Sequence, residues 1–109
     1  MDDNQARQRL SVRLAELDEE DRISAEGRAP VTLQQDSVGR LSRMDALQVQ
    51  AMALAAERRR AAERQRIGAA LGRLDEGEWG WCLRCGEEIA EARLEHDPSV
   101  TLCVKCASE

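Results

Sequence analysis

Cys82-Leu-Arg-Cys85 and Cys103-Val-Lys-Cys106, two cysteine pairs separated by 17 residues, decide the fold of the C-terminal third of this chain. The spacing falls in the range of structural zinc sites. Two residues between paired thiolates let one tight turn direct both sulfurs to the same ion at about 2.3 Å, and two such turns complete a tetrahedron. The sequence therefore predicts that Cys82, Cys85, Cys103 and Cys106 bind one structural zinc ion.

Two other interpretations of this region are weaker. A dithiol redox pair needs an exposed cysteine of low pKa beside a thioredoxin-like strand and helix, and the sequence predicts neither element here. His96, the only histidine of the chain, lies between the pairs and could replace a cysteine. Because four cysteines already complete the site, we expect a solvated histidine and a closed site that cannot activate water. An enzyme is therefore the least favoured class of function.

The composition favours long helices in a cytoplasmic protein. Charged residues make up 34% of the 109 residues, and Phe and Tyr are absent. No apolar run approaches the roughly 18 to 20 residues of a membrane span, and the first residues are acidic, unlike a secretory signal. We expect no membrane segment and a reducing compartment, which favours metal binding over disulfides. The net charge of -5 disfavours direct DNA binding.

The first two thirds of the chain predict two helices. Residues 2–26 lack Pro and Gly, and leucines recur in them at helical spacing: Leu10, Leu14 and Leu17. Gly27 and Pro30 then interrupt the pattern. Residues 38–76 are rich in Ala, Leu, Arg and Glu and predict a longer second helix.

These patterns predict a mainly α fold, in which a long antiparallel coiled-coil hairpin (1–76) precedes a small C-terminal C4 zinc finger (77–109). The turn of the hairpin is expected near residues 28–37. The apolar stripes match in a register that pairs Leu10 with Leu54 and Leu17 with Leu47. Dimerisation through the same stripe is the alternative, although we expect a monomer.

Three further features lie outside the cysteine pairs. Trp79 and Trp81 flank the first pair, and we expect them to pack the finger against the end of the second helix. The run from Asp18 to Asp21 is interpreted as a solvated acidic face. Five arginines between residues 58 and 66 form the only basic patch, which either pairs with acids such as Asp2 and Asp3 or forms a docking or anion-binding surface.

The last third of the chain resembles the DksA/TraR family of bacterial transcription regulators, which carry a C4-type zinc finger. The resemblance is dense from about residue 66 to 106. It rests on a tryptophan-rich entry into the first pair, on the gap between the pairs and on short motifs around them: Glu78-Trp79-Gly80-Trp81-Cys82, Cys85-Gly86, Glu88-Ile89, Arg93-Leu94-Glu95, Pro98 and Leu102-Cys103. Upstream, the shared feature is a long antiparallel coiled coil before the finger.

The resemblance implies a non-enzymatic factor that binds RNA polymerase and inserts its coiled coil through the secondary channel toward the active site, modulating initiation. The finger and the helix base would dock at the rim, where Arg66 and Arg93 are candidate contacts. The family's best-known tip carries an Asp-x-Ala signature, whereas Ser42-Arg43-Met44 aligns there. Asp36, Asp45 and Arg43 are therefore the candidate tip residues.

The alarmone ppGpp is a further ligand that the resemblance implies. The family's basic residue just before the finger's proline is Asp97 in this chain, although Arg66 matches a basic position on the second helix. Since a carboxylate repels an anionic ligand, we expect ppGpp binding less than polymerase binding. Two other classes of function stay open: a zinc-stabilised module that dimerises or binds another partner, and a nucleic-acid-binding zinc ribbon that uses the arginine patch.

Overall fold

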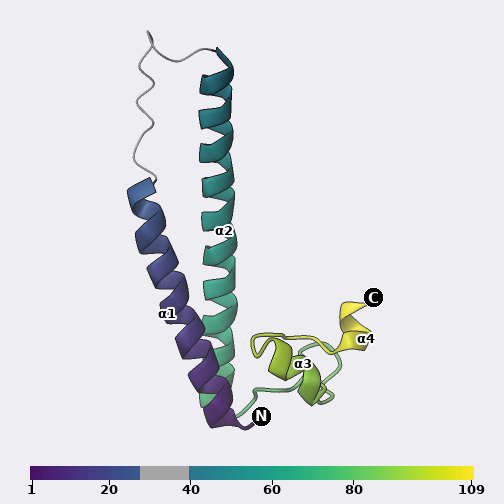
Figure 1. The fold of residues 1–109 in the computed structure, drawn as a ribbon. Coiled ribbons are helices and arrows are strands. Elements are labelled where there is room, and N and C mark those ends of the chain that lie inside the picture. The colour runs from purple at the N-terminus through teal and green to yellow at the C-terminus, as the bar shows by residue number, and fades with distance from the viewer. Residues whose placement is uncertain (28–39) are drawn as a thin grey trace.

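The structure, a computed structural model, describes residues 1–27 and 40–109, with side chains described for 1–25 and 43–109. Within that part it contains four helices: α1 (Asp3–Gly27), α2 (Arg40–Glu76), α3 (Glu91–His96) and α4 (Val104–Ala107). The helices α1 and α2 run antiparallel, and the segment with α3 and α4 lies beside the base of this hairpin (Figure 1). The predicted fold class is confirmed. The predicted turn, with Asp36, lies outside the described residues.

The core of the hairpin lies in its lower half, near the finger. Three buried residues of α1 pack with three of α2: Ala6, Leu10, Leu17, Ile67, Ala70 and Leu74. Leu14 and Leu71 pack against them from the edge. Small alanines alternate with leucine and isoleucine, which lets the two helices approach closely. The buried part of α2 is therefore its last three turns, next to the zinc finger.

The predicted register of the hairpin was wrong. Leu47 and Leu54, the expected partners of Leu17 and Leu10, are 58% and 42% exposed. Instead, Ile67 and Leu74 lie in the core, so α2 is displaced by several helical turns from the expected register. An apolar stripe that repeats every three or four residues is buried almost equally well in many registers, so the stripe alone could not select one.

Ion pairs between the helices specify the register that is observed. The guanidinium of Arg13 donates to both carboxylate oxygens of Glu63, at 2.7 and 3.0 Å. Arg60 donates to Asp21 at 2.6 Å, and Arg64 contacts Asp21 as well. These pairs can form in only one alignment of the two helices, and charge pairs of this kind commonly fix the register of coiled coils.

The charged runs therefore have partners other than those expected. Arg60 and Arg64 pair with acids, but the acids are Asp21 and Asp18 rather than Asp2 and Asp3. The run from Asp18 to Asp21 is not simply a solvated face, because two of its carboxylates join α1 to α2. Among the described residues, pairing with acids, one of the two expectations for the arginine patch, is thus observed for Arg60 and Arg64.

These pairs make the stability of the hairpin depend on pH. Hydrogen bonds from Arg60, and then from Arg64, lower the pKa of Asp21 below its usual value of 3.8. A hydrogen bond from Arg13 likewise lowers the pKa of Glu63 below 4.5. A carboxylate whose folded-state pKa is depressed stabilises the folded state above its unfolded pKa, and this contribution is lost as the pH falls through the folded pKa. We expect the urea midpoint to fall from about pH 5 downward.

Asp21→Asn tests this expectation, because it removes one of the depressed carboxylates. The variant should lose stability less steeply than the wild type between about pH 5 and pH 3, measured by urea denaturation followed by far-UV circular dichroism. Asp45→Asn, at an exposed position of α2, is the matched control and should keep the wild-type slope. Loss of zinc in acid is common to all three proteins, so identical slopes for Asp21→Asn and the wild type would rule out the effect.

A glycine ends α2 and begins the finger. Gly77 has a φ of 73°, in the left-handed region that side chains disfavour. Its N–H donates to the carbonyl of Leu74, and the next N–H, of Glu78, donates to that of Arg73 at 2.8 Å. Such a pair of bonds closes a helix by satisfying its last carbonyls. The chain therefore leaves α2 in a defined direction.

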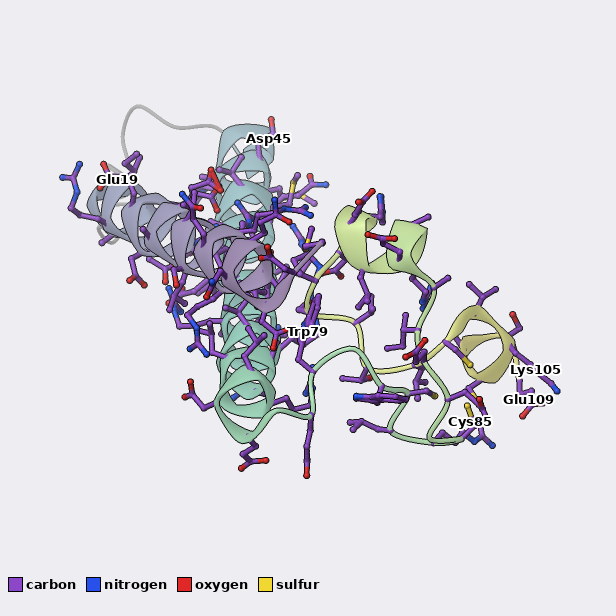
Figure 2. The ribbon with its side chains drawn as sticks, turned by 90° about the horizontal axis from the view of Figure 1, so that it is seen from below. Glu19, Asp45, Trp79, Cys85, Lys105 and Glu109 are labelled. Carbon is purple, nitrogen blue, oxygen red and sulfur yellow. The ribbon has the colours of Figure 1, made fainter. Side chains whose placement is uncertain are left out.

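Trp79 joins the hairpin to the finger. It packs against the hairpin core and also against the finger core, which is formed by Cys82, Ile89, Leu94 and Cys106. Its indole N–H donates to the carbonyl of Pro98 at 2.8 Å. Figure 2 shows Trp79 between the two parts. The expected packing role holds for Trp79, whereas Trp81 is 45% exposed.

In the described part of the chain, no helix is long and apolar enough to cross a membrane.

Candidate metal centre

Each cysteine pair lies in a tight turn that the local backbone stabilises. In the first turn, the N–H of Gly86 donates to the carbonyl of Cys82 at 2.9 Å, and Gly86 adopts a φ of 76°. In the second, Cys103 caps α4, and its sulfur accepts from the N–H of Cys106 at 3.4 Å. The N–H of Leu83 donates to the carbonyl of Thr101 at 2.8 Å, which ties the two turns together.

The four sulfurs form one cluster in which every pair lies within 4.8 Å. The Cys85 and Cys103 sulfurs are 3.8 Å apart. A tetrahedral zinc ion with zinc–sulfur distances of about 2.3 Å requires sulfurs about 3.8 Å apart, so the cluster has the dimensions of such a site. All four cysteines are free thiols, as metal binding requires. A donor set of four sulfurs suits zinc and leaves it no open position.

The cluster also needs positive charge. Hydrogen bonds from the backbone N–H groups of Cys85 and Cys103 lower the pKa of Cys82 to about 6. The neighbouring Cys103 side chain, followed by burial, raises the pKa of Cys106 to about 12. Four sulfurs this close cannot all ionise against one another, and a divalent cation supplies the charge that makes four thiolates stable together.

The site is buried on one side and exposed on the other. Cys82 and Cys106 are only 2% and 7% exposed and belong to the finger core. Cys85 is exposed, and Cys103 is intermediate. His96 is exposed and is not part of the cluster. The zinc site is thus a part of the small core, which has few other large apolar residues.

The candidate tip residues lie far from this centre. Arg43 and Asp45 are exposed in the first two turns of α2, at the end of the hairpin opposite the finger (Figures 1 and 2). The third candidate, Asp36, lies outside the described residues. The structure therefore separates the metal centre from the candidate tip by most of the length of α2, whose 37 residues span about 55 Å.

The two candidate contact arginines have different environments. Arg66 lines a cavity of about 640 Å³ between the hairpin and the finger, together with Arg13, Asp97 and others. Arg93 is not among its lining residues; its Nε donates to the carbonyl of Leu102 at 2.8 Å, which fastens α3 to the segment before the second cysteine pair. Arg93 thus stabilises the finger through this hydrogen bond.

Asp97 also has a structural task that the sequence did not reveal. Its carboxylate accepts from the N–H and the hydroxyl of Ser99, at 3.0 and 2.7 Å. Ser99 is 3% exposed, so this carboxylate satisfies a buried hydroxyl. The spacing Asp-Pro-Ser is typical of such turns and could have indicated it. The acid at this position helps to shape the loop that leads to Cys103.

Comparisons with known proteins agree with this geometry. Residues 77–109 match the prokaryotic dksA/traR C4-type zinc finger. The RNA polymerase-binding transcription factor DksA of Haemophilus influenzae is 45% identical over 42 residues, which are 38% of this chain and 29% of that protein. An uncharacterized protein of Aquifex aeolicus is 49% identical over 43 residues, 39% of this chain and 30% of that protein.

The likeness of the whole fold comes from a solved structure. Transcription factor DksA2 from Pseudomonas aeruginosa has a TM-score of 0.81 and 24% identity, over 97% of this chain and 80% of that chain. The predicted resemblance is confirmed, because residues 77–109 match the dksA/traR C4-type zinc finger and the whole fold is similar to that of DksA2. The prediction of one structural zinc ion is likewise confirmed by this match and by the sulfur cluster.

Proposed function

We propose that this chain is a transcription regulator that acts by binding RNA polymerase. The observation that carries the proposal is the combination of a dksA/traR zinc finger with a hairpin fold similar to that of DksA2. The relative from Haemophilus influenzae, whose name states that it binds RNA polymerase, matches this chain in the finger. The role is non-enzymatic, because a closed four-sulfur site offers no position for a substrate.

The hairpin enters the secondary channel of the polymerase with its tip toward the active site. Its form supports this mode, because the molecule extends over 62 Å in one direction and only 30 and 19 Å in the others. Exposed Arg43 and Asp45 lie near the far end and are free to contact the enzyme. The candidate tip residues are Asp36, Arg43 and Asp45, and the finger and helix base dock at the rim, with Arg66 and Arg93 as candidate contacts.

The charges around Arg66 support a reduced role for ppGpp. The cavity that Arg66 lines contains the carboxylates of Glu16, Glu63 and Asp97 as well as the guanidinium groups of Arg9 and Arg13, so its formal charges balance. Asp97 is held in place by Ser99, so it cannot easily turn away from an anion. A carboxylate fixed in the cavity that Arg66 lines opposes a highly anionic ligand there. We propose that this chain binds ppGpp less readily than it binds RNA polymerase.

A second function is favoured by one observation. Several apolar side chains in the first half of α2 are 42% to 65% exposed: Met44, Leu47, Val49, Met52 and Leu54. Met44, Leu47 and Leu54 share one face of the helix, and an exposed apolar face of this kind is suited to a protein partner or to a second copy of the chain. Sedimentation velocity distinguishes the two functions, because the polymerase-binding factor is a monomer at micromolar concentration and the interaction module is a dimer.

A competition assay tests the leading proposal. Zinc-loaded protein is bound to core RNA polymerase, and a known secondary-channel factor is added as competitor. We expect the factor to displace the protein, because both would occupy the same channel.

Asp36→Ala and Asp45→Ala should still bind but lose the effect on initiation, by about tenfold or more for the residue at the tip. Glu19→Ala, at an exposed position of α1 that is assigned to neither the tip nor the base, is the matched control.

The possible failures of this assay are distinct. If the zinc-loaded protein does not bind core polymerase, the proposal is wrong, and the interaction module becomes the leading function. If the protein binds core polymerase but the channel factor does not displace it, RNA polymerase remains the partner, and insertion into the secondary channel is rejected. Wild-type activity for both Asp36→Ala and Asp45→Ala would remove these acids as the tip determinants.

A further inference from the structure

The two cysteine pairs share a pattern that the zinc ligands alone do not explain. Each pair encloses an apolar residue followed by a basic one, Leu83-Arg84 in the first and Val104-Lys105 in the second. Residues 77–109 contain seven acidic residues and only three basic ones. Two of these three bases thus directly precede a zinc ligand, and the third, Arg93, is bound to the carbonyl of Leu102.

Arg84 reaches from the first pair to the second. Its Nη1 approaches the carbonyl of Cys106 at 3.5 Å and the carboxylate of Glu109 at 3.9 Å. The Arg84 side chain is 58% exposed, and Cys85, the zinc ligand that follows it, is also exposed. Lys105 lies on α4, and Figure 2 shows it with Cys85 at the end of the finger away from the hairpin.

The negative charge of the zinc-bound site suggests a function for Arg84 and Lys105. Four thiolates with one divalent zinc ion carry a net charge of about -2, whereas the four metal-free sulfurs are less negative, because they cannot all ionise against one another. A nearby cation therefore stabilises the zinc-bound state more than the metal-free state. The acidic surroundings of the finger make this compensation more important, because its other charges act in the opposite direction.

We propose that Arg84, with a smaller contribution from Lys105, increases the zinc affinity of the finger by compensating the negative charge of the four-thiolate site. Arg84 has the larger effect because it extends across the site to the second pair, whereas Lys105 has no comparable contact among the described residues. The two are positioning residues and do not bind the metal. The inference is independent of polymerase binding.

Equilibrium competition with a zinc indicator measures this effect. A kinetic assay with an anionic chelator would be ambiguous, because the same cations would attract the chelator. At about 50 mM salt we expect Arg84→Gln to weaken zinc binding about fivefold and Lys105→Gln about twofold. Both effects should fall below about twofold near 1 M salt, where a Debye length of about 3 Å screens exposed charges. Arg84→Lys should stay close to the wild type.

The controls separate charge from packing. Leu83→Ala changes a neighbouring exposed side chain of the same turn without changing its charge, and it should leave the zinc affinity within about twofold. If Arg84→Gln binds zinc as tightly as the wild type, the inference is overturned. It is also overturned if Arg84→Lys or Leu83→Ala weakens zinc binding as much as Arg84→Gln does. The same holds if the loss of zinc affinity in Arg84→Gln is equally large at high salt. In each case the geometry of the turn, and not its charge, would be responsible.

Discussion

Replacement of Cys82 by Ser should abolish zinc binding and unfold the finger. Cys82 is 2% exposed and belongs to both the sulfur cluster and the finger core. The other buried residues of that core are Ile89, Leu94 and Cys106. So small a core cannot hold the module without its metal, because structural zinc contributes about 10 to 16 kcal/mol of apparent binding free energy in zinc-finger peptides.

Zinc content and near-UV circular dichroism of the two tryptophans measure this loss. The far-UV signal of the hairpin should be largely retained, because its core and interhelical ion pairs do not involve the metal. His96→Ala is the matched control: His96 lies outside the cluster, so this variant should keep a full equivalent of zinc. Retention of tightly bound zinc by Cys82→Ser, or its loss from His96→Ala, would show that the ligand set is wrong.

Trp79→Ala should destabilise both parts of the molecule. Trp79 packs against the hairpin core and the finger core, and its indole binds the Pro98 carbonyl. Truncation removes a side chain that packs against both cores and leaves the Pro98 carbonyl without its partner. Because buried Trp→Ala changes cost about 3 to 5 kcal/mol and Trp79 is only partly buried, we expect a loss of about 3 kcal/mol.

Urea denaturation with two probes measures the effect of Trp79→Ala. In the wild type, far-UV circular dichroism of the helices and the fluorescence of the finger should report coincident transitions. In Trp79→Ala the two transitions should separate, because the main bridge between the cores is lost. Trp81→Ala, at a site that is 45% exposed, should cost less than about 1 kcal/mol. Equal losses for both variants would contradict the special role of Trp79.

The zinc site could be predicted from the sequence because its information is local. Two residues between paired cysteines fix the turn, and the gap of 17 residues falls in a known range, so no long-range contact had to be inferred. The helices were predicted for a similar reason, since leucine spacing and the interruption by Gly27 and Pro30 are visible within short windows.

The register of the hairpin could not be predicted in this way. Leu10 could pair with any apolar residue one or more turns away along α2 at similar cost, so matching the stripes chose Leu54 wrongly. The pairing of Arg13 with Glu63 breaks this degeneracy. Charges distant in sequence specify alignment only once both helices are placed, and the sequence contains too many acids and bases to identify the pairs beforehand.

The contacts of individual arginines also could not be predicted from local sequence patterns. Arg93, a candidate contact, also binds the Leu102 carbonyl within the finger, and its motif did not indicate this bond. The approach of Arg84 to the second cysteine pair depends on how the two turns face each other. Side chains as long as arginine reach many positions, so their partners follow from the tertiary fold.

Site-specific cross-linking tests the central proposal most directly. A photoreactive residue placed at Arg43, in the zinc-loaded protein bound to core RNA polymerase, reports what surrounds the end of the hairpin. The proposal expects cross-links to polymerase segments that line the secondary channel near the active site, and their loss when a channel factor is added. Cross-links confined to the outer surface of the polymerase, or cross-links that the competitor does not reduce, would contradict it.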